Sequence, residues 1–398
     1  MPGPLAGIKV LDLSSVVLGP LATQIMGDLG ADVIKIEGPE GDTTRSTGPG
    51  RSDDMAAIFM GFNRNKRSLV LDLKQKPACD ALWTLIDDAD VFIHSIRPQK
   101  IARLGFGHEA VLARNSRIVY AGIHGYRTGG PLEGTPAYDD VIQGASGIAG
   151  LFQERDGEPQ LVPSVVADKS AALMASSGLI AAYVKRLRTG RGVYMECSMF
   201  EGLVSYNLVE HQWGAVFCPP ESKSGYTRLL SRNRRPHRTL NGFICLLPYT
   251  DQHWDAFWKI SGASKMAADP RFSTMPLRAS NIDTLYGETG KVIATRTTEE
   301  WEKLLTEADI PVGRVNSLKD LKDDPHLKEI GFFRPYEHPT EGKMEIPDTP
   351  YRFDRESLPI LRHPPQLGEH GKEILSELGM SQQEIQSALR QTTKAHNT

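Results

Sequence analysis

The chain has 398 residues, of which 40% are hydrophobic and 24% charged, which is ordinary for a globular protein with room for two domains. Its formal net charge of −3 excludes a broad electrostatic attraction to nucleic acid or to anionic membranes. The sequence shows no signal peptide and no apolar run of the ~18 residues that a membrane helix needs. We therefore expect a cytoplasmic protein with no nucleic-acid or membrane partner.

The four cysteines, Cys79, Cys197, Cys218 and Cys245, are scattered along the chain and form no Cys-x-x-Cys pair. This usage favours free thiols in a reducing compartment over a disulfide framework or a zinc site. We expect no metal site.

The first part of the chain alternates between strand and helix patterns. Strands are predicted at residues 7–13, 31–37, 68–73, 91–94 and 118–123, and helices at 20–30 and 76–89. The first helix has proline in its first turn and glycine at its end, as helices commonly do. Strand–helix alternation of this kind predicts an α/β fold, with a doubly wound, mostly parallel, Rossmann-like large domain.

The pattern changes after about residue 215. A strand at 242–247 and helices at 251–260 and 298–308 predict a smaller α+β domain. Proline becomes frequent from about residue 325, which indicates an extended segment, and the chain closes with an exposed helix near 381–390 and a polar tail.

We expect three parts along the chain. They are a large domain over residues 1–215, a small domain over 225–325, and a linking strap over 326–398 that returns to a large domain.

The turn after the first strand, residues 14–20, lacks the Gly-x-Gly-x-x-Gly pattern, so a dinucleotide site of the usual kind is disfavoured. A ligand site outside the carboxyl ends of the strands stays open. Asp168 begins a long helix of small residues, and Asp139 stands at another predicted helix start. On pattern alone, both are helix caps.

Basic residues cluster near predicted strands. Residues 63–68 form either a solvated basic loop or a phosphate contact, and Arg97 and Arg103 follow another strand. Basic groups from different strand ends are able to converge on a polyphosphate. The glycine-rich segment 122–131 allows a ligand to approach the backbone closely.

These segments, in this order, resemble the family III CoA-transferases, the group that includes formyl-CoA and carnitine CoA-transferases and α-methylacyl-CoA racemase. The matching segments are 10–13, 19–20, 29–37, 41–45, 65–74, 125–147, 167–168, 188–199 and 365–379. They are collinear over nearly the whole chain. No single one is diagnostic, but the ordered set is highly specific.

The resemblance implies that Asp168 is a nucleophile that attacks the thioester of an acyl-CoA, giving a mixed anhydride and then an aspartyl-CoA thioester. Asp is expected to be ionised at pH 7 without a general base. The residues implied to contact CoA are Val16, Val17, Leu71, Lys74, Arg97, Arg103 and Tyr138. The resemblance further implies an interlocked homodimer, with CoA or acyl-CoA as substrate and no tightly bound cofactor.

The sequence departs from the family pattern in informative places. Gly38 stands where formyl-CoA transferase has arginine, and the glycine loop of that enzyme's small domain is missing from residues 234–242, which disfavours formate. The racemase branch carries histidine where this chain has Tyr138, and its small-domain glutamate is missing from 246–254. A racemase needs acid–base groups on both faces of the substrate, so a transferase is favoured.

The acceptor is a carboxylic acid, and several basic or polar side chains are candidates to bind a second carboxylate on it. They are His124, Arg127, His211, Arg232, Arg234 and His237. We therefore expect a dicarboxylate such as succinate, glutarate or a branched C5 diacid, with succinyl-CoA or a similar acyl-CoA as donor. The alternatives are an α-methylacyl-CoA racemase or epimerase and a non-catalytic CoA-binding protein.

Overall fold

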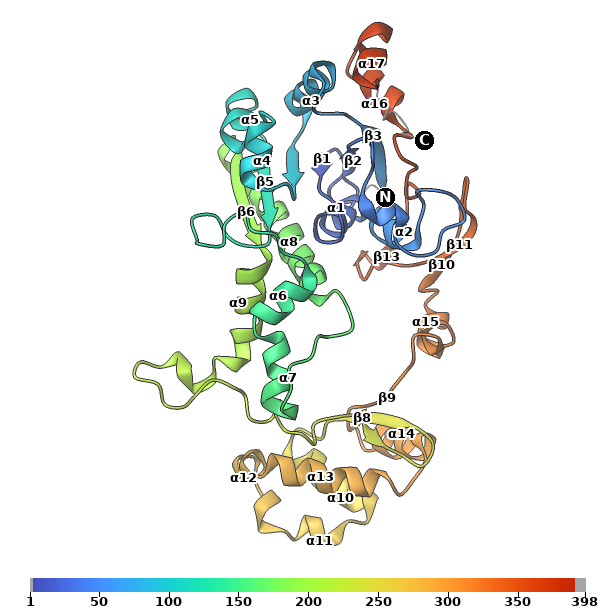
Figure 1. The fold of residues 1–398 in the computed structure, drawn as a ribbon. Coiled ribbons are helices and arrows are strands. Elements are labelled where there is room, and N and C mark those ends of the chain that lie inside the picture. The colour runs from blue at the N-terminus through green and yellow to red at the C-terminus, as the bar shows by residue number, and fades with distance from the viewer. Residues whose placement is uncertain (1–2, 391–398) are drawn as a thin grey trace, which may run out of the picture. The chain divides into compact units, whose positions relative to one another are not determined.

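The computed structural model describes residues 3–390, which divide into two compact units (Figure 1). The first unit holds the described residues up to Gly147, then Leu161–Tyr206, and those from Arg334 onward. The second holds Ile148–Gln160 and Asn207–Phe333. Compared with the expected domain boundaries, residues 148–160 group with the second unit and the chain after Arg334 groups with the first.

The first unit is built on a six-stranded sheet in the order β3-β2-β1-β4-β5-β6, with every neighbouring pair parallel. The strands are β1 (Lys9–Leu13), β2 (Asp32–Glu37), β3 (Lys66–Val70), β4 (Val91–His94), β5 (Val119–His124) and β6 (Val193–Ser198). This confirms the predicted parallel α/β fold. The order reverses between β1 and β4, where such sheets leave a crevice outside the carboxyl ends of their strands.

Helices cover both faces of this sheet. They are α1 (Leu18–Asp28), α2 (Ala57–Phe62), α3 (Lys76–Asp88), α4 (Pro98–Arg103), α5 (His108–Arg114), α6 (Asp139–Ala145), α8 (Val166–Thr189), α16 (Gly371–Glu377) and α17 (Gln382–Ala388). Successive residues of a strand point to opposite faces. On β1, Leu11 and Leu13 therefore pack toward α3, whereas Asp12 accepts a hydrogen bond from Thr23 of α1.

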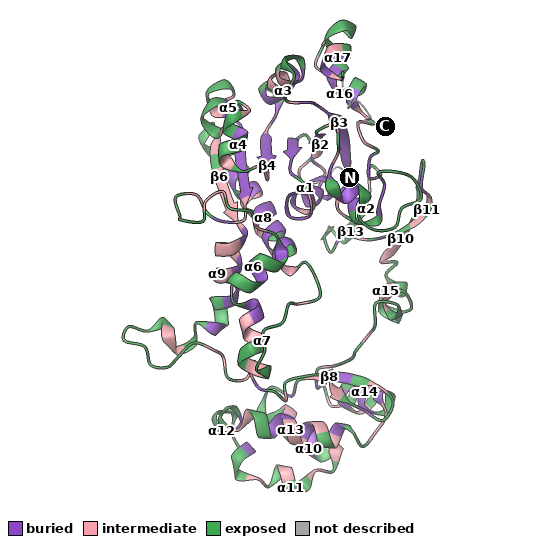
Figure 2. Ribbon diagram, in the orientation of Figure 1, coloured by how far each residue is buried: buried purple, intermediate pink, exposed green. Residues whose placement is uncertain are grey.

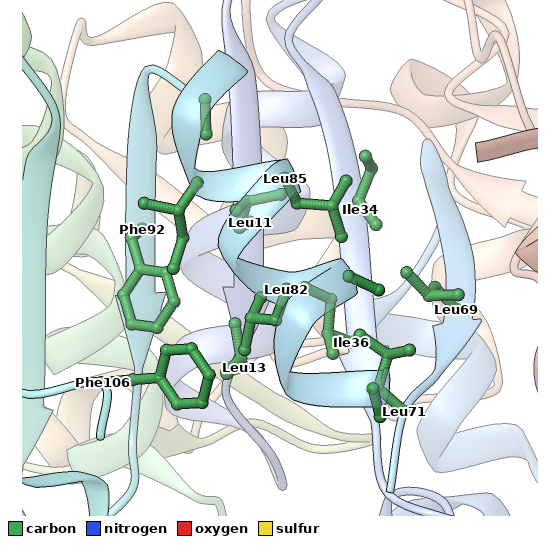
Figure 3. Packing of buried hydrophobic residues seen from close by; sticks show 14 of the residues in the cluster. Leu11, Leu13, Ile34, Ile36, Leu69, Leu71, Leu82, Leu85, Phe92 and Phe106 are labelled. Carbon is green, nitrogen blue, oxygen red and sulfur yellow. The ribbon is translucent and has the colours of Figure 1, made fainter. Parts of the chain in front are cut away.

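The core on the α3 side is a continuous layer of aliphatic and aromatic side chains (Figure 3). Strand residues Leu11, Ile34 and Leu69 face Leu82 and Leu85 of α3, and all five are at least nine-tenths buried. Burying a leucine or isoleucine side chain contributes about 1.5–3 kcal/mol each. This layer fixes the strand ends from which the site below is built.

The end of the chain returns to this core. The predicted terminal helix is α17, and it is exposed on one face only, because Ile385 and Ala388 are each 2% exposed and the helix packs against α3. The proline-rich segment is not simply extended, since it forms α15 (Pro325–Glu329) and the strand pairs β10 (Phe333–His338) with β11 (Gly342–Pro347) and β12 (Arg352–Phe353) with β13 (Glu356–Ser357). The predicted polar tail lies outside the described residues.

The second unit has a small antiparallel sheet in the order β7-β8-β9 with helices around it, as the α+β pattern predicts. Its strands are β7 (His237–Arg238), β8 (Phe243–Leu246) and β9 (Val312–Arg314). Its helices include α7 (Ile148–Asp156), α10 (Asp251–Ser261), α11 (Ser264–Ala267), α12 (Met275–Ser280), α13 (Ile282–Ile293) and α14 (Thr298–Glu307), and α9 (Met199–His211) leads into it. Trp254, Phe257 and Trp301 belong to its core. Figure 2 shows buried residues, in purple, on its helices as well as on the central strands of the first unit.

A network of buried charges lies beneath the turn that follows β1. Nζ of Lys66 is 3.1 Å from Asp12, and Nζ of Lys35 is 2.9 Å from Asp42, with all four side chains at most 1% exposed. Burial would raise the pKa of Asp12, but Lys66 and Lys35 outweigh it and lower the pKa to about 2. The carboxylate is therefore held ionised inside the protein.

The ion pairs formed by residues 63–68 show that both interpretations of this basic segment were wrong. Arg64 pairs with Asp28 at 2.7 Å, and Arg67 pairs with Asp32 at 2.6 Å. Since these guanidinium groups and the Lys66 ammonium are buried in internal ion pairs, the segment is neither a solvated loop nor a phosphate contact. Its charges hold β3 to α1 and β2.

Replacing Lys66 with methionine is expected to lower the free energy of unfolding by about 3–5 kcal/mol, because it leaves the buried Asp12 carboxylate without its nearest cation. Urea unfolding at neutral pH measures the effect. Lys76→Met is the matched control, because the Lys76 side chain is 83% exposed and its ion pair within residues 3–390 is with Asp80, so its loss should cost less than about 1 kcal/mol. Equal destabilisation by the two substitutions would contradict this account.

Candidate active site

A cavity of about 220 Å³ lies in the first unit at the carboxyl ends of the central strands. Its wall is built from segments that follow three strands: Ser15 and Val16 after β1, Ser95 and Arg97 after β4, and His124 and Gly125 at the end of β5. Tyr138 and Asp168 complete it. The cavity thus occupies the place that the reversal of strand order provides for a ligand.

Asp168 lies in the first turn of α8, and its residue is 8% exposed. The N-cap of this helix is Val165, and no side chain caps it. The interpretation of Asp168 as a helix cap was therefore wrong. Instead, the carboxyl group lines the cavity.

Asp139 holds the start of α8 against α6. The backbone N–H of Asp168 donates a hydrogen bond of 3.0 Å to Oδ1 of Asp139, and Nε2 of Gln143 donates to Oδ2. Gln143 also accepts from the backbone N–H of Val162 at 2.9 Å and donates to the carbonyl of Ser164 at 3.1 Å. The segment that enters α8 is therefore tied to α6 by one carboxylate and one amide.

Burial and the neighbouring carboxylate of Asp139 raise the pKa of Asp168 to about 7. Desolvation is the larger cause, because it penalises the charged form. The expectation that Asp168 is ionised at pH 7 without help is therefore corrected, because a pKa of about 7 leaves a substantial share of these carboxyl groups neutral at that pH. The positive end of α8 does not cancel the cost of burial.

The turn after β1 brings the backbone of Val16 to the cavity in an unusual conformation. Val16 has a φ of 70°, which a β-branched residue rarely adopts. Its N–H points at the carboxylate of Asp42, with both oxygens 3.2 Å away, and Asp42 is in turn paired with buried Lys35. The buried ion network thus stabilises the strained turn that forms one wall of the site.

Gly125 allows the opposite wall to close. A Cβ built on this residue would lie 2.3 Å from the Cβ of Ala137, too close for any side chain without movement of the backbone. The absence of a side chain therefore lets the segment after β5 approach the segment that precedes α6, and both contribute to the cavity.

Three of the seven residues implied to contact CoA share the cavity with Asp168, namely Val16, Arg97 and Tyr138. The other four do not line it. Val17 and Leu71 are buried, Lys74 is exposed after β3, and Arg103 is exposed at the end of α4. Contact of these residues with CoA stays a prediction.

The residues proposed to bind a second carboxylate are divided between the two units. His124 lines the cavity beside Asp168, and burial lowers the pKa of its imidazole, which favours the neutral ring. Arg127 is exposed in the same unit. His211, Arg232, Arg234 and His237 belong to the second unit, where Arg234 and His237 line a separate cavity.

Sequence reasoning missed two residues that shape the site. Asp139 was expected only to cap a helix, yet it holds the backbone of Asp168 and raises the pKa of its side chain. The spacing of Asp139 and Gln143, four residues apart on one helix face, was the available signal. Asp42 lies in the matching segment 41–45, but nothing in that segment indicated its contact with the backbone of Val16, because the contact depends on the turn after β1.

Two negative findings apply to residues 3–390. No group of three or more His, Cys, Asp or Glu side chains in this range is arranged to hold a metal ion. No helix in the same range is both long and apolar enough to cross a membrane.

The raised pKa of Asp168 predicts that replacing this residue with asparagine stabilises the folded protein, by an amount that depends on pH. The folded protein keeps the Asp168 proton up to about pH 7, whereas the unfolded chain loses it near pH 4, so this group makes folding less favourable as pH rises between those values. Asp168→Asn removes that penalty, and its stability relative to wild type should grow from pH 4 to 7 by about 2–4 kcal/mol and then level off.

Urea unfolding of wild type and Asp168→Asn across this range measures the difference. Asp140→Asn is the control, because Asp140 is exposed on the same helix as Asp139. A difference between Asp168→Asn and wild type that is the same at pH 5 and pH 8 would show that the pKa of Asp168 is ordinary.

Comparison with known proteins assigns the family. Residues 5–371 match the model of CoA-transferase family III. The chain is 30% identical to mouse succinyl-CoA:glutarate CoA-transferase over 94% of this chain and 86% of that protein. It is 31% identical to formyl-CoA:oxalate CoA-transferase of Escherichia coli O6:H1 over 98% and 99%. A CAIB/BAIF family protein from Brucella suis has the same fold, with a TM-score of 0.80, 28% identity, and coverage of 95% and 100%. The chain therefore belongs to CoA-transferase family III.

Proposed function

We propose that the protein transfers CoA from an acyl-CoA to a carboxylic acid through covalent intermediates on Asp168. The observation that carries this proposal is the placement of one carboxyl group, desolvated and with a raised pKa, in a cavity at the switch point of a family III sheet. A raised pKa in a cleft is typical of a group that takes part in chemistry. A basic carboxylate is also a better nucleophile than an ordinary one once it is ionised.

The exchange proceeds in balanced steps. An oxygen of ionised Asp168 attacks the thioester carbonyl, the C–S bond breaks, and CoA leaves as a thiolate. The thiolate then attacks the Asp168 carbonyl of the anhydride, which releases the first acid and forms an aspartyl-CoA thioester. The incoming carboxylate repeats the two steps in reverse and leaves as the new acyl-CoA. Every intermediate is an activated acyl group, so no step needs an external energy source.

The other residues around the cavity bind the CoA ester and take no part in forming or breaking its bonds. Arg97 offers a cation at the cavity edge, and Tyr138, which is 67% exposed, offers a hydroxyl and a ring that a bound CoA ester is able to cover. We assign both to the CoA ester. Val17, Leu71, Lys74 and Arg103 stay candidates for its more distant parts.

We propose dicarboxylic acids as the exchanged acids, with succinyl-CoA or a similar ester as donor. The mouse relative acts on succinyl-CoA and glutarate, and the E. coli relative on formyl-CoA and oxalate, so dicarboxylates appear in both. The chain lacks the arginine and the glycine loop of formyl-CoA transferase, which favours a C4 or C5 acid over oxalate and formate.

We further propose that the protein works as a homodimer in the cytoplasm. Long apolar side chains are exposed on α8 of the first unit, including Leu173 and Leu187, which are 53% and 63% exposed. Exposed apolar side chains on one helix are typical of an interface. The four free cysteines fit a reducing compartment.

Incubating the protein with succinyl-CoA is expected to give a covalent adduct on Asp168, detected by mass spectrometry of the peptide after trapping with hydroxylamine. Asp168→Ala should lose the adduct and lower CoA exchange by at least about a thousandfold, since covalent catalysis is removed. Asp140→Ala is the matched control, and both the adduct and the exchange should persist in it. Full activity of Asp168→Ala would refute the proposal.

The racemase alternative predicts a different isotope result. A racemase removes the α-proton of an acyl-CoA and returns one from solvent, which requires a base on each face. With Tyr138 in place of histidine, we expect no deuterium at the α-carbon of 2-methylacyl-CoA recovered after incubation in D₂O. Deuterium incorporation that is lost in Asp168→Ala would assign the protein to the racemase branch instead.

A further inference from the structure

The second unit contains a cavity of about 570 Å³ whose charged lining is cationic. Arg228, Arg234 and Arg235 line it together with His237. None of the three arginines forms an ion pair with an acidic side chain of residues 3–390, unlike the buried arginines of the first unit. The cavity therefore concentrates positive charge that the described chain leaves uncompensated.

Arg228 is only partly satisfied by the described residues. Its Nη1 donates to the hydroxyl of Tyr286 at 3.0 Å, whereas its Nε is buried and has no hydrogen-bond partner. A buried donor without a partner costs free energy. Arg228 therefore adds a cationic group to the cavity lining that its protein contacts do not saturate.

One face of α13 holds the basic wall in place. Asp283 accepts hydrogen bonds from Ser231 at 2.7 Å and from the backbone N–H of Asn233 at 3.3 Å. Tyr286 lies one turn further along the same helix and holds Arg228. The positions of two arginine-bearing segments are thus set by side chains three residues apart on one helix.

Gly290, on the same face of α13, lets the segment that contains His237 approach the helix closely. A Cβ on Gly290 would lie 3.1 Å from Nδ1 of His237, tighter than ordinary van der Waals contact. A side chain at this position would press on the segment that carries Arg234 and Arg235. His237, which follows the two exposed arginines in the chain, is therefore packed against α13.

The apolar residues that line the rest of the cavity favour anions with an apolar part. Leu246, Leu247 and Val312, from β8 and β9 and the residue after β8, add an apolar surface. Arginine binds carboxylates with two parallel hydrogen bonds, and an apolar wall suits the methylene chain between two carboxylates. The volume is in the range of small-molecule sites. Inorganic phosphate would use the arginines but leave the apolar surface without a partner.

We propose that this cavity is a binding site for a short dicarboxylate. Arg234 and Arg235 hold the ligand, and Arg228 belongs to the same cavity lining. The choice of a dicarboxylate rests on the proposed function, whereas the existence of an anion site in the second unit does not. Binding is therefore measured with the free acids alone, without CoA, so that it does not depend on chemistry at Asp168.

Isothermal titration calorimetry of the full-length protein with glutarate and succinate tests the proposal. We expect saturable binding that Arg234→Gln and Arg235→Gln each weaken about tenfold or more, because each removes a charged hydrogen-bond donor. Arg271→Gln is the matched control, since Arg271 is an exposed arginine of the same unit that pairs with Asp269. It should bind like wild type.

Any of four results would overturn the proposal. One is the absence of saturable binding of either acid, and another is wild-type affinity in both arginine variants. The third is phosphate binding at the same arginines as tightly as glutarate, which would make the cavity a general anion site. Butyrate should bind at least tenfold more weakly than glutarate, and equal affinity, the fourth result, would count against two-carboxylate recognition. If the wild-type protein binds the free acids but shows no CoA exchange and no adduct on Asp168, only the proposed function is refuted.

Discussion

The contact between Asp139 and the start of α8 determines the character of the site. One oxygen of this carboxylate accepts the backbone N–H of Asp168, and the other accepts from Gln143. The same negative charge, together with burial, raises the pKa of Asp168 to about 7. Asp139 thereby fixes where the backbone of Asp168 lies and adds to the effect of burial on the pKa of its side chain. The two carboxyl groups of the site have different roles. That of Asp139 accepts a hydrogen bond from the backbone of Asp168, and that of Asp168 lines the cavity.

The rest of the first unit supports this arrangement through its topology and its buried charges. The reversal of strand order between β1 and β4 leaves the crevice, and the segments after β1, β4 and β5 line it. The strained turn at Val16 is held by Asp42, which is paired with Lys35. Breaking one of these buried pairs would leave a charge without compensation, so the network also ties the shape of the site to the stability of the sheet.

Much of the fold follows from the sequence because most strands are rich in Val, Ile and Leu and alternate with helical segments. The alternation up to residue 123 predicts the parallel sheet, and the structure confirms it. The buried face of the terminal helix was missed because the partners of Ile385 and Ala388 come from distant α3. The basic segment around Lys66 was misjudged for the same reason, since its acidic partners lie on other elements.

The candidate nucleophile came from the ordered family motifs, whereas its proton affinity required the structure, because desolvation depends on packing that no local pattern encodes. The most direct test of the account is the rate of Asp168 acylation by succinyl-CoA in a single turnover, followed by rapid quenching at several pH values. If ionised Asp168 with a pKa of about 7 is the nucleophile, the rate should rise about tenfold between pH 6 and pH 8. A rate that does not change over this range, or an acyl group on another residue, would contradict the account.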